Sequence, residues 1–147
     1  MSERVLVTGG AGFIGSHVVT SLIEKGFKVG VVDDLRNSKF EVLGRLKEIT
    51  RSEIDFFKVN ILTPKDVFKV FNDFRPTSVV HLAADKSPSE SVLDPVKYYR
   101  NNIMGLCNVL DSMGLIECDK IVFSSSAAVY GIPASLPITE KIPTVPT

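Results

Sequence analysis

Hydrophobic positions follow two alternating spacings along this 147-residue chain. Short runs of apolar and β-branched residues, typical of buried strands, alternate with stretches in which apolar residues recur every three to four positions, typical of helices. The strands are predicted at residues 4–8, 28–33, 54–59, 78–83 and 120–124. Because these strands are largely apolar and are joined by predicted helices, they indicate an α/β protein with a parallel sheet covered on both faces.

Residues at the predicted helix ends support these boundaries. The first helix should run from Phe13 to Lys25, with Gly26 in the left-handed position that follows a helix. Thr63 should cap the third helix with its hydroxyl group, and Pro64 suits its first position. A longer helix should begin at Asp94-Pro95. Its apolar face carries Tyr99, Ile103, Leu106 and Leu110.

The first strand leads into a glycine-rich turn, which is followed by a helix. The turn contains Gly9, Gly12 and Gly15. Glycine lets the backbone approach a pyrophosphate closely, and a helix N-terminus offers free N–H groups and partial positive charge. Asp33 follows Gly12 by about 20 residues, the spacing at which an acid reaches the ribose of a dinucleotide. A turn used only for packing would not require the acid, so the sequence predicts a bound dinucleotide.

The order of elements favours a doubly wound, Rossmann-type sheet with strand order 3-2-1-4-5 and the ligand between strands one and four. Asp33 and Asp34 would repel a 2′-phosphate, so we expect NAD rather than NADP. Arg36 leaves the alternative open, because a nearby arginine can accommodate that phosphate.

Composition excludes several classes of function. Lysine plus arginine (17) balance aspartate plus glutamate (17), so we expect neither nucleic acid nor an anionic membrane as a partner. There is no apolar stretch of about 18 residues, which argues against a membrane span. The two cysteines, Cys107 and Cys118, suggest free thiols in a reducing compartment, and hence a cytoplasmic protein. We assign no metal ligands.

Four prolines in the last fifteen residues argue against a helix or a central strand there. We expect residues 1–131 to form a dinucleotide-binding domain and residues 132–147 an extended, proline-rich tail. Because a doubly wound domain seldom stops in such a loop, we also expect this chain to be the N-terminal part of a longer protein whose C-terminal substrate domain is absent.

Four blocks carry a family resemblance. They are Thr8 to His17, Asp33 to Ser38, Tyr98 to Gly105 and Phe123 to Gly131. In these blocks the chain resembles the extended short-chain dehydrogenase/reductases, and the UDP-glucose 4-epimerases (UDP-galactose 4-epimerases) in particular. The resemblance covers essentially all of the chain but only the N-terminal portion of a family member.

The resemblance implies a set of NAD contacts. Phe13 and Ile14 would offer backbone to the pyrophosphate. Around the adenosine ribose would lie Asp33, Asp34, Leu35, Arg36, Asn37 and Ser38. Beside the adenine would lie Asn60, where the family usually has aspartate, and Ile61. Further along the cofactor would lie Leu82, Ala83, Ala84, Lys86, Asn101 and Ser124.

Each of these assignments has a simpler alternative. Lys86 could be a solvated loop residue, Asn101 could bond a neighbouring loop, and Ser124 could serve only the strand end. Asp85, Pro88 and Ser89 depart from the family pattern, so the loop after the fourth strand should be shaped differently.

The implied reaction is inversion at C4 of a UDP-sugar through a 4-keto intermediate. Ser126 corresponds to the residue that bonds the sugar 4-hydroxyl and helps to move its proton. The family's base is a Tyr-x-x-x-Lys pair, which these 147 residues do not contain, so we expect the chain to be inactive by itself. The alternatives are a non-catalytic dinucleotide-binding module or another extended reductase acting on a nucleotide sugar.

The resemblance also implies a homodimer for the complete protein, in which the helix beginning at Asp94-Pro95 takes part in the contact. Without the helix that follows strand five in the family, that apolar face and the edge of strand five would be uncovered. We therefore expect the isolated chain to be marginally stable and to associate with itself or with a complementing C-terminal fragment.

Overall fold

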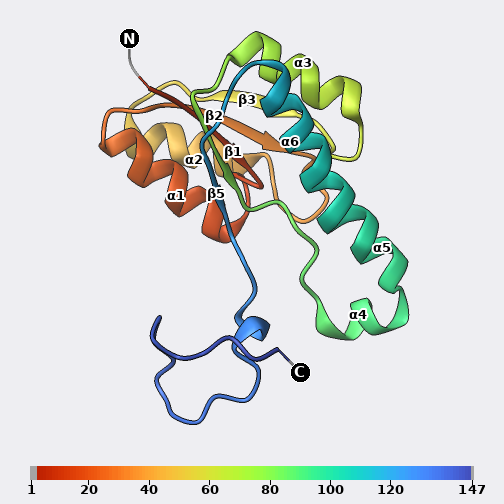
Figure 1. Cartoon of the computed structure of the whole chain (residues 1–147). Helices are drawn as coiled ribbons and strands as arrows, with labels where there is room; N and C mark the ends of the chain where they lie inside the picture. The colour runs from red at the N-terminus through yellow and green to blue at the C-terminus, as the bar shows by residue number, and fades with distance from the viewer. Residues whose placement is uncertain (1–2, 147) are drawn as a thin grey trace.

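The computed structural model describes residues 3–146, which form a parallel sheet with helices on both faces (Figure 1). The strands are β1 (Arg4–Thr8), β2 (Lys28–Asp33), β3 (Asp55–Lys58), β4 (Ser78–His81) and β5 (Ile121–Phe123). Their spatial order is β3-β2-β1-β4-β5, with every neighbouring pair parallel. The predicted fold class and strand order are confirmed.

The helices match the predicted positions, with additions. They are α1 (Phe13–Glu24), α2 (Glu41–Thr50), α3 (Pro64–Phe74), α4 (Pro88–Leu93), α5 (Pro95–Tyr99) and α6 (Gly105–Leu115). The sequence pattern did not predict α4 or the short 3-10 helix η2 (Ala127–Tyr130). The predicted hydroxyl cap at Thr63 is wrong, because its side chain makes no capping hydrogen bond, whereas Pro64 occupies the first turn as expected.

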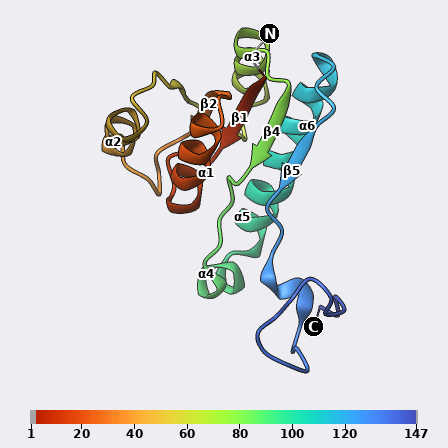
Figure 2. The same cartoon turned by 90° about the vertical axis from the view of Figure 1, so that its left-hand side faces the viewer.

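Alternation along the central strands places two cores on opposite faces of the sheet. Val5 and Val7 of β1 pack with α1 and α2, while Leu6 packs with α3 and α6. Figure 2 shows α1 and α6 on opposite sides of the sheet. Phe71, which belongs to the core formed by Leu6, α3 and α6, is 1% exposed. Burial on both faces explains why the strands are continuously apolar.

The long predicted helix is interrupted by a π-helical turn, η1 (Arg100–Met104), between α5 and α6. Such turns widen the helix locally and are frequent at functional sites. Here the turn carries Asn101, whose side chain is almost fully buried.

The chain after β5 leaves the sheet and extends beyond the carboxyl ends of the strands (Figures 1 and 2). Most of its residues are exposed, and it contains no α-helix or strand up to residue 146. Within residues 3–146 no helix is long and apolar enough to cross a membrane.

Candidate functional site

The glycine turn joins β1 to α1 through close backbone contacts. Gly9 has a φ of 70°, and its N–H donates to the Val32 carbonyl at 2.8 Å. The N–H of Gly12 donates to the Gly9 carbonyl at 3.1 Å. A Cβ atom on Gly15 would lie 2.1 Å from that same carbonyl oxygen. The first turn of α1 therefore lies directly on the glycine loop, and only glycine allows this approach.

The N-terminus of α1 is open to a ligand. Gly12 occupies the capping position and has no side chain that could satisfy the helix N–H groups. The first turn contains no acidic residue, and the side chain of Phe13 is 80% exposed. This arrangement favours an anion such as a pyrophosphate.

Asp33 ties the glycine turn to the loop that follows β2. Its Oδ2 accepts a hydrogen bond from Ala11 N at 3.1 Å, and its Oδ1 accepts from Leu35 N at 2.9 Å and from Ser38 Oγ at 2.8 Å. The carboxylate thus fixes the two loops that the sequence assigned to the pyrophosphate and the adenosine ribose.

Arg36 connects this loop to two other elements. Its N–H donates to Asp34 Oδ1 at 3.1 Å, and its Nε lies 3.4 Å from Asp34 Oδ2. The guanidinium Nη2 lies 3.2 Å from Oδ1 of Asp85, in the loop after β4, and also donates to Oδ1 of Asn101 in η1. The carboxyl ends of β2 and β4 are therefore joined across the strand-order switch point.

The sequence predicted only that Asp85 would alter the shape of its loop. The structure also shows its side chain in contact with Arg36. Its backbone is fixed by Asn102, which accepts from Asp85 N and donates to Asp85 O, both at 2.8 Å. Its side chain is 5% exposed, and its Oδ2 has no hydrogen-bond partner within residues 3–146. An acid three residues before a proline-initiated helix gives no sequence signal of this contact, because the partners lie far away in the sequence.

Thr8 and His81 hold the start of the loop after β4. Thr8 Oγ lies 3.3 Å from the N–H groups of Leu82 and Ala83, and 2.9 Å from His81 Nδ1. Since the hydroxyl accepts from the two amides, its own proton goes to Nδ1. Burial lowers the pKa of His81 to about 4, so the ring is neutral near pH 7. His81 is therefore a buried structural residue of β4 that helps to hold the loop after this strand.

The remaining predicted site residues differ in how they are held. Asn60 Oδ1 accepts from Leu62 N at 2.8 Å, which makes a turn after β3, and the Ile61 carbonyl accepts from Asn108 at 2.9 Å. Ala84 and Lys86 are exposed beside buried Asp85.

The two predicted serine positions follow β5. Ser124 is exposed, and its N–H donates to the His81 carbonyl at 3.1 Å. Ser126 is exposed too, and its hydroxyl accepts from Ala128 N at 3.1 Å at the start of η2. The structure thus brings the glycine turn, the loops after β2 and β4 and Asn101 together, while Ser126 lies after β5, at the start of η2.

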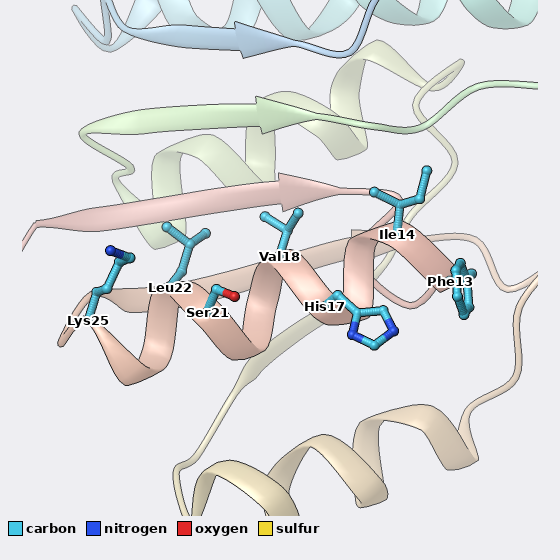
Figure 3. A pocket seen from close by; sticks show the side chains of 7 residues that line it. All are labelled: Phe13, Ile14, His17, Val18, Ser21, Leu22 and Lys25. Carbon is cyan, nitrogen blue, oxygen red and sulfur yellow. The ribbon is translucent and has the colours of Figure 1, made fainter. Parts of the chain in front are cut away.

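A groove of about 380 Å³ runs along α1, from Phe13 and Ile14 beside the glycine turn to Lys25 at the other end of the helix. Figure 3 shows Ile14, Val18 and Leu22 directed to the side of the strands, with Phe13 and His17 on another side of the helix. Its lining is mainly apolar, with His17, Ser21 and Lys25 as its polar side chains, and contains no carboxylate that could meet a ribose.

Comparison with known proteins identifies the family. Residues 6–147 match the family described as GDP-mannose 4,6 dehydratase. The chain belongs to this family. The relatives of this family member include UDP-glucose 4-epimerases from Dictyostelium discoideum, 46% identical over 97% of the chain, and from Bacillus subtilis, 45% identical over 95%. The chain spans about 42% of the length of the first of these relatives.

Solved structures agree with this relationship. A UDP-glucose 4-epimerase from Bifidobacterium longum, in complex with NAD+ and UDP, superposes with a TM-score of 0.91 at 40% identity. The enzyme from Stenotrophomonas maltophila, with bound NAD and formylated UDP-arabinopyranose, gives 0.90 at 37% identity. This family member covers 42% and 43% of those chains, and 97% of it is matched in each. The expected resemblance to UDP-glucose 4-epimerases is confirmed.

Proposed function

We propose that this chain binds NAD at the carboxyl ends of β1, β2 and β4. The observation that carries the proposal is the combination of an uncapped helix N-terminus on a closely packed glycine turn with the Asp33 carboxylate beside it. The residues present fit the cofactor, because N–H groups and partial positive charge favour the pyrophosphate and an acid favours ribose hydroxyl groups. Relatives of known structure with NAD bound support this assignment.

Under this proposal, the predicted contacts divide along the cofactor. The N–H groups of Phe13 and Ile14 would meet the pyrophosphate, and the loop 33–38 would surround the adenosine ribose. Asn60 and Ile61 would lie beside the adenine. The residues 82–84, Lys86, Asn101 and Ser124 would lie toward the nicotinamide.

For the whole protein we propose nucleotide-sugar 4-epimerisation, with UDP-glucose and UDP-galactose as substrates and a role in galactose metabolism. The family description names a dehydratase, but elimination needs an acid and a base beside the sugar, and methyl groups at Ala127 and Ala128 supply neither. Bound NAD would accept a hydride from sugar C4 and return it. The Ser126 hydroxyl would hydrogen-bond the sugar 4-hydroxyl and help to move its proton.

We expect the 147 residues alone to bind the cofactor without turning over substrate, because they contain no Tyr-x-x-x-Lys pair. A C-terminal substrate domain, or a complementing fragment, would supply the base. Tyr99, Ile103 and Leu110 are 65%, 52% and 44% exposed, which supports a homodimer contact on this helical face in the complete protein. Free Cys107 and Cys118 support a cytoplasmic location.

Two measurements test the proposal. Calorimetric titration of the chain with NAD should show one site, and absence of binding would contradict the cofactor assignment. Assay of the natural full-length gene product with UDP-galactose should yield UDP-glucose. A 4-keto-6-deoxy sugar would instead show a dehydratase, and a full-length product that binds NAD without turnover would favour the non-catalytic module.

A further inference from the structure

Arg36 is held by acceptors from three different elements. Its guanidinium contacts Asp34 in its own loop, Asp85 after β4 and Asn101 in η1. An arginine at the end of the second strand is the kind of residue that accommodates the 2′-phosphate of NADP. In this chain that arginine is directed to the opposite loop.

The contact with Asp85 is costly to break. The Asp85 side chain is 5% exposed, and its second carboxylate oxygen has no partner in the described chain. No other cation of residues 3–146 makes a salt bridge with it. If Arg36 moved away, a buried carboxylate would be left without its counter-charge, which is strongly unfavourable.

Asp85 also lacks freedom to follow the arginine. Asn102 bonds both the N–H and the carbonyl of Asp85 at 2.8 Å and thereby fixes this part of the loop to the π-helical turn. The carboxylate is therefore a fixed anchor, while Arg36 lies on an irregular loop with a half-exposed side chain.

We propose that Asp85 is a cofactor-specificity residue: it holds Arg36 away from the adenosine ribose, so that the site selects a dinucleotide with a free 2′-hydroxyl over one with a 2′-phosphate. Asp85 acts here as a positioning residue, through Arg36. The inference rests on the proposed dinucleotide site and adds to it a reason why an arginine in the ribose loop does not admit NADP.

The test compares NAD and NADP binding to the 147-residue chain and to Asp85→Asn, by calorimetric titration at fixed salt. The variant keeps the side-chain size and removes the negative charge that draws Arg36 to the loop after β4, while the contact with Asp34 in its own loop remains. We expect the affinity for NADP relative to NAD to rise about tenfold or more, with NAD affinity changed less than about threefold. A merely structural role would weaken both cofactors together and leave the ratio unchanged.

Two further variants show whether a gain in NADP binding acts through Arg36, and a third replaces Asp85→Asn if that variant does not fold. Asp85→Asn combined with Arg36→Ala should lose the gain in NADP binding, because the phosphate partner is gone. Asp119→Asn removes one negative charge from an exposed loop and should leave the ratio unaltered. Asp85→Ala, which also frees the arginine, replaces Asp85→Asn if circular dichroism shows that the amide variant is unfolded.

The outcomes separate the two proposals. An unchanged ratio in a folded variant that binds NAD overturns the role of Asp85 and leaves the NAD site intact. A gain in NADP binding that persists without Arg36 also overturns it. If the unaltered chain binds neither dinucleotide, the proposed site itself is wrong and the inference falls with it.

Discussion

The carboxyl edge of the sheet has two halves that are built differently. In the β1–β2 half, the glycine turn, Asp33 and the start of α1 are joined by backbone contacts and hydrogen bonds between distant residues. In the β5 half, Ser126 is exposed and its side chain bonds Ala128, two residues along. The first half is a site that this chain prepares by itself. The second presents a chemically useful residue without fixing it.

This difference has a consequence for function. Phosphate and ribose recognition depends on backbone N–H groups and one carboxylate, which a single strand-turn-helix-strand unit can supply. Proton transfer needs side chains placed within hydrogen-bond reach of the substrate. This chain fixes the groups that recognise phosphate and ribose, but it leaves the Ser126 hydroxyl exposed. It is therefore better suited to binding a dinucleotide than to catalysing turnover.

Replacing Gly15 with alanine should have the largest effect on the β1–β2 half. Its Cβ would lie 2.1 Å from the Gly9 carbonyl oxygen, so the turn and helix must separate, at a cost of about 3 kcal/mol in the free energy of unfolding. NAD binding should be lost as well. Urea denaturation and calorimetric titration measure both effects.

Gly44→Ala is the matched control for that change. No atom lies within 4 Å of the Cβ that alanine would add there, within helix α2, so the free energy of unfolding should stay equal or rise by up to about 1 kcal/mol. Equal losses in both variants would show that the glycine turn is not specially constrained.

Asp33→Ala should weaken NAD binding more than Asp34→Ala. The Asp33 carboxylate accepts three hydrogen bonds that join two loops, so its loss should reduce affinity about 30-fold, or about 2 kcal/mol. The Asp34 side chain contacts Arg36 in its own loop and should matter less. Titration of both variants with NAD is the measurement, and the reverse order would contradict the assignment of Asp33.

The sequence was sufficient to predict the β1–β2 half of the carboxyl edge, because the residues that determine its structure lie close together along the chain. Glycine spacing, strand composition and the acid at Asp33 are all visible in one strand-turn-helix-strand segment. Strand order then followed from general rules of crossover handedness. These features predicted the sheet order and the position of Asp33 beside the glycine turn, whereas the other expected cofactor contacts were implied by the family resemblance.

The contacts of Asp85 could not be predicted in the same way. They depend on a π-helical turn that no sequence pattern marks, and on partners that lie about 50 residues before and 17 residues after it. Pro88 was likewise no sufficient signal for α4, since the segment from Pro88 to Leu93 is too short to show helical periodicity. The predicted hydroxyl cap at Thr63 was wrong because capping depends on side-chain geometry as well as on residue type.

Lowering the pH should destabilise the β4 end of the site through His81. The pKa of His81 is lowered to about 4 by burial, so between about pH 4 and 6.5 the unfolded chain binds more protons than the native state. Stability is therefore lost as pH falls through this window, by about 1 kcal/mol between pH 7 and pH 5.5. Urea denaturation at the two pH values measures the loss.

His81→Gln should reduce this pH dependence, whereas His17→Gln should not, because His17 is exposed on α1. A pH dependence that is identical in all three proteins would show that His81 is not protonated on unfolding.

The smallest expected effect is at β5, in the other half of the sheet. Val122 is 64% exposed on β5, the edge strand of the described sheet, so Val122→Lys should change the free energy of unfolding by less than about 0.5 kcal/mol. A lysine on an edge strand opposes pairing with another chain, so the same variant should lower self-association in sedimentation velocity runs over a range of concentrations. Val92→Lys adds the same charge at a position on α4 that is 81% exposed and serves as the control. If Val92→Lys disperses the chain and Val122→Lys does not, the contact involves α4 and the edge of β5 is not used.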